Sequence, residues 1–228
     1  MADLIVTIDG PAASGKSTAA RGLAQKLGAS FLDTGAMYRA VTLAAMQHGI
    51  NLKEEQELLG IIKRSDFQFH ADKSEMKVCI DGVDVTEQIR SPQVTANARY
   101  IASAQKVREE LVQMQRQFAA EQQSIVTEGR DQGTVAFADA NIKFFLIADS
   151  IERAKRRQAE LRDKGATENT EETDLSQIQK EIEDRDKSDR DRTVGPLKPA
   201  NDAIVIDTTN LNIEQVVDKL LSHVRENV

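Results

Sequence analysis

Residues 4–18 read LIVTIDGPAASGKST, an apolar run followed directly by a glycine-rich loop. The loop matches the pattern G-x-x-x-x-G-K-[ST], whose glycines let backbone N–H groups bend inward around an anion. The run LIVTI is typical of a buried strand and residues 17–27 have helical spacing, so the strand–loop–helix context of a phosphate-binding loop is complete. We therefore expect Lys16 to reach the β- and γ-phosphates of a nucleotide and the Ser17 hydroxyl to bind Mg²⁺. The candidate donor-binding residues of the loop are Gly10, Pro11, Ala12, Ala13, Ser14, Gly15, Lys16, Ser17 and Thr18.

The patterns after the loop predict a doubly wound α/β sheet. Short apolar stretches predict core strands at 30–32, 125–127, 142–148 and 203–206, with helical spacing between them and after Asn212, a possible helix cap. Alternating apolar residues around the turn Asp81-Gly82 predict a small antiparallel piece at about 66–89. Residues 164–174 are polar and acidic, and we expect an exposed mobile loop there. The expected fold class is α/β, a P-loop NTPase-type parallel sheet flanked by helices, with a small antiparallel insertion and a mobile lid.

Composition narrows the class of protein. A chain of 228 residues, 40% of them hydrophobic, is long enough for one α/β domain with an insertion but short for two domains. No apolar run approaches about eighteen residues and no basic-then-apolar leader precedes Leu4, so we expect a soluble cytoplasmic protein without a membrane partner. The single cysteine, Cys79, excludes an internal disulfide, and the net charge of −7 argues against a sequence-independent nucleic-acid partner.

Three segments concentrate arginines in this acidic chain. They are DTGAMYR at 33–39, EGRDQGT at 128–134 and RDKSDRDR at 185–192. The first two follow predicted strands, so Arg39 and Arg130 should converge where ligands of such sheets bind, although each alone could be a surface ion pair. Arg185, Asp189 and Arg192 are spaced i, i+4 and i+7, which predicts one shared helical face and a phosphate clamp, although alternating charges also suit a solvated helix. Further cations on the preceding predicted helix are Arg153, Arg156 and Arg157.

The sequence lacks motifs that other classes of nucleotide-binding protein require. Neither an NKxD motif nor a DxxG motif is present, which disfavours a GTPase switch. Asp149 could mimic the acidic strand end of an ATPase motor, but it better suits a strand-to-helix loop. His48, His70 and His223 belong to no constellation that supplies a general base. A phosphate acceptor is already an anionic nucleophile and needs no base, so arginines, Mg²⁺ and a lid together indicate a nucleoside monophosphate kinase.

Six segments resemble the bacterial cytidylate kinase family, and the resemblance extends from about residue 4 to the C-terminal helix. They are IDGPAASGKST, LDTGAMYRA, IDGVDVTEQIRSPQV, KVREELVQMQRQF, EGRDQGTVAFADA and DRDRTVGPLKPA. IDGVDVTEQIR together with GRDQGTV is far more specific than the loop alone. The resemblance implies transfer of the γ-phosphate of ATP to CMP or dCMP, with Mg²⁺, in the cytoplasm and by a monomer. It also implies a core at about 1–36, 97–157 and 195–228, an NMP-binding insertion at about 37–96 and a lid at about 158–194.

The resemblance also implies roles for individual residues. Arg39 and Arg130 would hold the acceptor phosphate, and Arg185 and Asp189 would meet the sugar. Arg108 and Asp131 would read the cytosine edge, because a carboxylate that accepts from the amino group distinguishes cytosine from uracil. The residues implied to bind CMP are Thr34, Tyr38, Arg39, Arg108, Arg130, Asp131, Arg185 and Asp189. Those implied in catalysis are Lys16, Arg39, Arg130 and Arg192, and Arg157 is implied in ATP binding.

Some positions depart from the family pattern. Arg99 stands where a serine usually contacts the base, and Ser103 lies one helical turn further on. Thr34 and Glu128 replace the more common serine and aspartate and keep the functional group. Arg99 is therefore the change that bears on base selectivity.

Two other functions stay open on the sequence alone. One is a P-loop kinase with a different acceptor, such as UMP or a small metabolite. The other is a nucleotide-binding regulator without turnover, which the presence of Lys16, Ser17 and all the clustered arginines disfavours.

Overall fold

The structure is a computed structural model that describes residues 2–72, 75–163 and 174–227. Its central sheet has five parallel strands in the order β2-β6-β1-β7-β8. These strands are β1 (Leu4–Asp9), β2 (Ser30–Asp33), β6 (Ser124–Gly129), β7 (Ile142–Ile147) and β8 (Ile204–Asp207). Each predicted core strand is present to within two residues, so the expected α/β sheet is confirmed.

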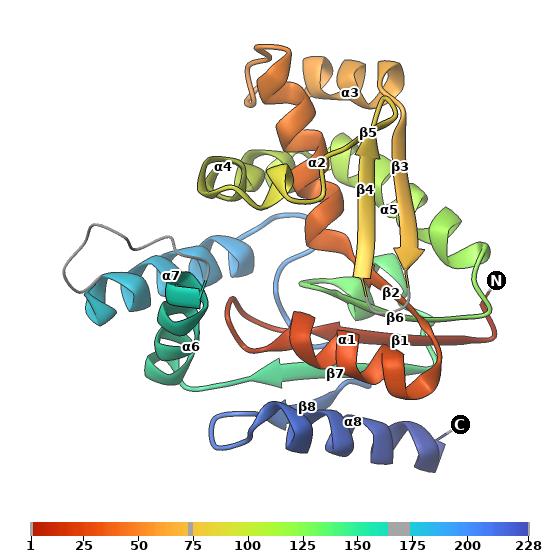
Figure 1. Cartoon of the computed structure of the whole chain (residues 1–228), viewed down its shortest axis with the longest axis vertical. Coiled ribbons are helices and arrows are strands. Elements are labelled where there is room, and N and C mark those ends of the chain that lie inside the picture. The colour runs from red at the N-terminus through yellow and green to blue at the C-terminus, as the bar shows by residue number, and fades with distance from the viewer. Residues whose placement is uncertain (1, 73–74, 164–173, 228) are drawn as a thin grey trace.

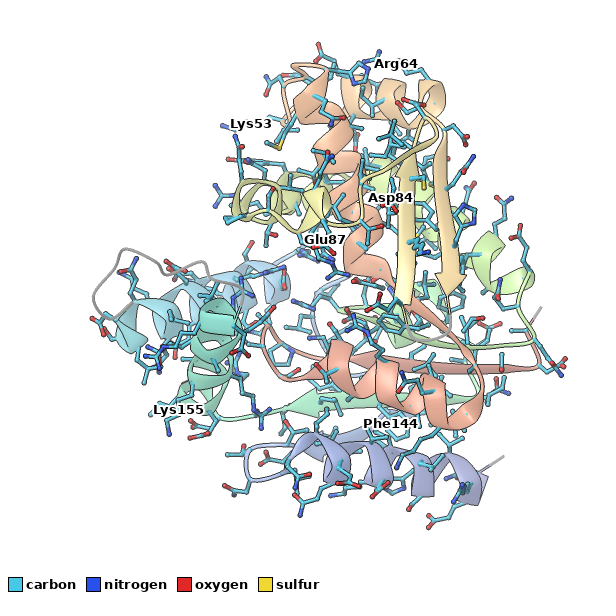
Figure 2. The ribbon with its side chains drawn as sticks, in the orientation of Figure 1. Lys53, Arg64, Asp84, Glu87, Phe144 and Lys155 are labelled. Carbon is cyan, nitrogen blue, oxygen red and sulfur yellow. The ribbon has the colours of Figure 1, made fainter. Side chains whose placement is uncertain are left out.

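Helices cover both faces of this sheet (Figure 1). One face packs against α1 (Lys16–Leu27) and α8 (Ile213–Asn227), and the other against α2 (Thr34–Gln47) and α5 (Gln105–Ala120). Successive residues of β1 point to opposite faces, since Val6 joins the first cluster and Ile5 the second. Phe144, labelled in Figure 2, lies in the first cluster, and its ring is 6.2 Å from that of His223 on α8.

The predicted antiparallel piece is a second sheet, β3-β4-β5, formed by β3 (Phe67–Asp72), β4 (Glu75–Ile80) and β5 (Val83–Asp84). Asp81 and Gly82 both have positive φ, 51° and 78°, as a type I′ hairpin turn requires. This sheet packs with α3 (Glu55–Arg64), the 3₁₀ turn η1 (Gln88–Arg90) and α4 (Pro92–Ser103) in the upper part of Figure 1. The sequence patterns had not indicated α3.

Helices α6 (Ser150–Asp163) and α7 (Leu175–Arg190) lie side by side at the left of Figure 1. The loop expected at 164–174 lies outside the described residues except for Asp174, whose side chain accepts from Ser176 N at the start of α7. Helix α7 ends at Arg190, so the expectation that Arg192 shares its face is wrong. The chain instead turns back at Gly195, with φ 61°, before Pro196, and Leu197 N donates to Asp189 O at 2.9 Å.

Within the described residues, none of the helices combines the length and the apolar character that crossing a membrane requires.

Candidate active site

The carboxyl ends of β1, β2 and β6 carry the candidate site, as parallel sheets of this kind predict. After β1 the chain enters the loop at Gly10, with φ 150°, and passes through Ala13 at φ 56° and Gly15 at φ 85°. A Cβ on Gly10 would lie 2.2 Å from Leu146 O of β7, so only glycine fits there. Helix α1 starts directly at Lys16 and points its N-terminus at the loop. This geometry is that of an anion-binding loop.

Lys16 is 5% exposed, and its Nζ donates to Pro11 O of its own loop at 2.7 Å. Burial and the nearby positive charge of Arg130 lower the pKa of Lys16 to about 7. The ammonium is thus held at the loop without a carboxylate partner within 4 Å among the residues that the structure describes. A phosphate would supply the missing negative charge, which agrees with the predicted role of Lys16.

Ser17 Oγ donates to Glu128 Oε1, at the end of β6, at 2.8 Å. A hydroxyl and a carboxylate are hard oxygen donors, and Mg²⁺ in kinases takes only one or two such protein ligands together with phosphate oxygens and water. The described residues contain no group of three or more His, Cys, Asp or Glu side chains that could hold a metal alone. Ser17 and Glu128 therefore fit a nucleotide-bound Mg²⁺ and would leave most of its ligands to phosphate and water.

Asp9, the last residue of β1, is a site residue that the sequence analysis missed. Its Oδ1 accepts from Gln132 N at 2.9 Å and its Oδ2 from Gly133 N at 2.8 Å. Both donors belong to the single π-helical turn η2 (Gln132–Ala136), a geometry often found at functional sites. Burial raises the pKa of Asp9 to about 7, against the two backbone hydrogen bonds. Asp9 thereby holds the segment that follows Arg130 and Asp131 against the start of the phosphate loop. The sequence signal that could have identified Asp9 is an acidic residue directly after an apolar run.

The end of β2 gathers residues of the candidate acceptor site. Asp33 caps α2 by accepting from Ala36 N at 2.9 Å and pairs with Arg39 at 3.2 Å and Arg90 at 3.8 Å. Although burial opposes it, these two arginines hold the pKa of the Asp33 carboxyl below its usual value. Thr34 Oγ1 donates to the Glu128 carbonyl at 2.7 Å and so ties the start of α2 to β6. Arg90 is an additional cation here that the sequence analysis did not single out.

Arg130 and the end of α7 meet through Asp189. Asp189 Oδ2 accepts from Arg130 Nε at 2.8 Å, and Oδ1 pairs with Arg192. The expected clamp in which Asp189 lies between Arg185 and Arg192 is thus corrected, because Arg130 takes the place of Arg185. Although burial opposes it, Arg130 and Arg192 hold the pKa of the Asp189 carboxyl below its usual value. Desolvation and the charge of Arg130 lower the pKa of Arg185 to about 10.

Arg108 and Asp131 form a buried ion pair, 3% and 4% exposed. The Arg108 guanidinium also lies 5.6 Å from the centre of the Tyr38 ring, and burial raises the pKa of Tyr38 to about 12. Burial likewise raises the pKa of Asp131, against the attraction of Arg108. The structure therefore brings together the residues that the sequence resemblance assigned to the base, and the Arg108 and Asp131 side chains are shielded from solvent.

A groove of about 380 Å³ borders the phosphate loop. Its walls include Ala13 and Gly15 of the loop, Arg156 and Arg157 of α6, and residues 211–213 at the start of α8. The groove is large enough for a planar heterocycle and is continuous with the loop, so it can hold the base of the nucleotide whose phosphates the loop binds. Arg157 was expected here, whereas the residues from 211 to 213 were not. Their polar and apolar mixture gave no sequence signal.

The side chains of two other candidates, Arg99 and Asp149, contact residues close to them in sequence. Arg99 is exposed on α4, with its guanidinium 5.0 Å from the centre of the adjacent Tyr100 ring, and Ser103 Oγ donates to Arg99 O. Asp149 accepts from Ile151 N at 2.8 Å at the start of α6, as expected for a strand-to-helix loop.

Comparison with known proteins agrees with this geometry. The sequence pattern that defines the family described as "Cytidylate kinase" matches residues 6–226. A protein of Desulforamulus reducens named "Cytidylate kinase" is 45% identical over 97% of this chain and 96% of its own length. A protein of Desulfitobacterium hafniense named "Cytidylate kinase" is 44% identical over 96% of this chain and 92% of its own length. A protein of Haemophilus influenzae named "Cytidylate kinase 1" is 42% identical over 97% of this chain and 94% of its own length. On this similarity, the chain belongs to the cytidylate kinase family.

Proposed function

We propose that this protein transfers the γ-phosphate of ATP to CMP or dCMP, giving ADP and CDP or dCDP, in cytoplasmic pyrimidine nucleotide metabolism. The observation that carries the proposal is the placement of two anion sites at one sheet edge, with a buried Arg108–Asp131 pair beside the second. The loop at Gly10–Lys16 supplies one anion site, and Arg39, Arg130 and the end of α7 supply the other.

On the donor side, the loop N–H groups and Lys16 would hold the phosphates of ATP, and the 380 Å³ groove beside Arg157 would hold its base. Ser17 and Glu128 would hold Mg²⁺. When bound, Mg²⁺ neutralises charge on the phosphate oxygens. Lys16 is buried, so its ammonium interacts with the transferring group in a medium less polar than water.

On the acceptor side, Arg39 and Arg130 would bind the CMP phosphate, with Arg192 on the transferring group. Each is already oriented by a carboxylate, Asp33 or Asp189. Preoriented guanidiniums match phosphate oxygens geometrically and lose less conformational freedom on binding. The acceptor phosphate needs no deprotonation, which agrees with the lack of a histidine in this site among the described residues.

At the base, the Asp131 carboxylate would accept a hydrogen bond from the cytosine amino group, and Arg108 would donate to an acceptor on the ring. Uracil carries an oxygen in place of that amino group and would face the carboxylate with a lone pair. A buried site built to accept a hydrogen bond rejects such an analogue strongly. Arg185 and Asp189 would bind the sugar.

The remaining parts of the proposal concern organisation. We assign the core to about 1–36, 97–157 and 195–228, the NMP-binding insertion to about 37–96 and the lid to about 158–194. The acting species would be a monomer, with neither nucleic acid nor membrane as a partner.

The proposal is tested by steady-state phosphoryl transfer from ATP·Mg²⁺ to CMP, dCMP and UMP in a coupled ADP assay. We expect a kcat/KM for CMP and dCMP at least about a hundredfold above that for UMP, the range of discrimination by a buried polar group. Equal use of UMP would contradict the base assignment. ADP release that does not depend on any acceptor would contradict the kinase assignment altogether.

A further inference from the structure

A buried ion pair outside the substrate contacts grips the backbone of the phosphate loop. Arg153 on α6 and Asp186 on α7 are 7% and 1% exposed and pair with each other. Asp186 Oδ1 accepts from Ala12 N at 2.8 Å, and Arg153 Nη1 donates to Ala12 O at 2.9 Å. Both backbone polar groups of one loop residue, Ala12, are therefore bound by one charged pair from two helices.

Apolar packing reinforces the same contact. Ala12 belongs to a small buried cluster with Ala154 of α6 and Ile178 and Ile182 of α7. Arg153 Nε also donates to Ala148 O at 3.1 Å, which anchors the pair to the end of β7. The loop is thus held by the α6–α7 pair through both polar and apolar contacts at Ala12, between Gly10 and Gly15.

The other end of the connection reaches the acceptor site. Asp189 lies three residues after Asp186, on the same face of α7, and pairs with Arg130 and Arg192. One helix face therefore carries two buried carboxylates, one bound to the donor loop and one to the acceptor arginines. A displacement of α7 moves both contacts together.

We propose that Arg153 and Asp186 are positioning residues that couple ATP binding at the phosphate loop to CMP binding at the arginines of the acceptor site. The inference rests on the proposed function for the identity of the acceptor. A nucleotide that orders the loop fixes Ala12, and through Asp186 it favours the position of α7 in which Asp189 orients Arg130. By linkage, CMP then raises the affinity for ATP by the same factor as ATP raises the affinity for CMP.

Calorimetric titrations test the coupling. The dissociation constants of a non-hydrolysable ATP analogue with Mg²⁺ and of CMP are measured for each ligand alone and in the presence of the other. The variants are Asp186→Asn, Arg153→Gln and the double variant. Lys155→Gln is the matched control, because Lys155 lies on the outer side of α6, is 55% exposed and, among the described residues, pairs with Glu152 of the same helix (Figure 2).

Each single variant should weaken binding of the ATP analogue about tenfold and bring the coupling factor close to one, since couplings of this kind typically span about 5–150-fold. CMP alone should bind within about threefold of the parent protein. The double variant should bind the ATP analogue at least as tightly as the single variant with the lower affinity, because an amide pair leaves no buried charge unpaired. Lys155→Gln should behave as the parent.

Unchanged affinity for the ATP analogue with an unchanged coupling factor would overturn the proposal. So would an equal loss of CMP and ATP affinity, which would make the pair merely structural. If Asp186→Asn does not fold, Arg153→Lys takes its place in the test. Lysine keeps the charge but cannot reach Ala12 O, Ala148 O and Asp186 together, so the same reduction of coupling is expected. If the parent itself binds no CMP, the proposed function fails, whereas loss of ATP affinity in the variants still tests the contact with the loop.

Discussion

Replacing Asp131 with asparagine should separate the proposed base recognition from phosphate binding. Asp131 is 4% exposed and pairs with Arg108 through Oδ2. Its other oxygen, Oδ1, makes no hydrogen bond in the part of the chain that the structure describes, and it is the atom proposed to accept from cytosine. Asparagine has the same shape as aspartate, and its side-chain oxygen can still accept from Arg108. Asp131→Asn should therefore fold.

The loss should fall on CMP. Truncating one partner of a buried charge pair in a binding site costs about 2–5 kcal/mol, and the isosteric amide places this change near the middle of that range. A loss of about 3 kcal/mol corresponds to a roughly 150-fold lower kcat/KM for CMP. The asparagine amide can donate to the carbonyl of uracil, so the ratio of kcat/KM for CMP to that for UMP should fall by at least about tenfold.

The measurement is a coupled ADP assay with CMP and UMP, together with calorimetric binding of ATP·Mg²⁺ alone. Asp139→Asn is the control, because Asp139 is an exposed aspartate close to the same turn, so its replacement removes the same charge. ATP affinity should stay within about threefold in both variants. A loss of ATP affinity as large as the loss of CMP use would show that Asp131 supports the site as a whole, and the reasoning about base recognition would be refuted.

Three further predictions concern other residues. Lys16→Ala should lower kcat by roughly a thousandfold or more in the same assay, as loss of a transition-state cation does, and near-normal turnover would exclude the phosphate-loop assignment. The pKa of Asp9 is raised from 3.8 to about 7, so between these pH values the folded state keeps a proton that the unfolded chain loses. The contribution of Asp9 to the free energy of unfolding therefore falls as the pH rises from about 4 to about 7. Chemical denaturation of Asp9→Asn should lack that component, and identical pH slopes in parent and variant would contradict it. Arg99→Ser should change the CMP-to-UMP ratio of kcat/KM by less than about threefold, because Arg99 is exposed and stacks on Tyr100, whereas a tenfold change would place Arg99 at the base.

Local patterns were enough to predict the sheet and the phosphate loop. The strand LIVTI, the glycines at 10 and 15 and the turn Asp81-Gly82 each depend on neighbouring residues, and the structure has all of them. Helix α3 was missed although its buried residues Leu58 and Ile61 have helical spacing, because the segment is only ten residues long and contains Gly60.

The partners of the buried acids depend on the tertiary fold and could not be read from spacing. Asp9 binds backbone groups of residues 132 and 133, and Asp186 binds Ala12, which is 174 positions away. For Asp189, the i, i+4 rule favoured Arg185, but the fold brings Arg130 to the carboxylate across 59 positions. The spacing rule considers only neighbours on the same helix, so it could not include a guanidinium that the fold brings in from the end of β6. The end of α7 was predictable, because Gly195 and Pro196 follow it closely.

The arrangement of these acids bears on how the proposed acceptor site would bind a phosphate. Asp33 holds Arg39 and Arg90, and Asp189 holds Arg130 and Arg192, so each carboxylate orients two guanidiniums. Without such partners, four cations would repel one another and fluctuate, and an incoming phosphate would have to order all of them. With one carboxylate for two arginines, each cluster keeps a net positive charge and retains unused donors that a dianionic phosphate can accept from. The carboxylates therefore lower the ordering cost of binding without cancelling the attraction.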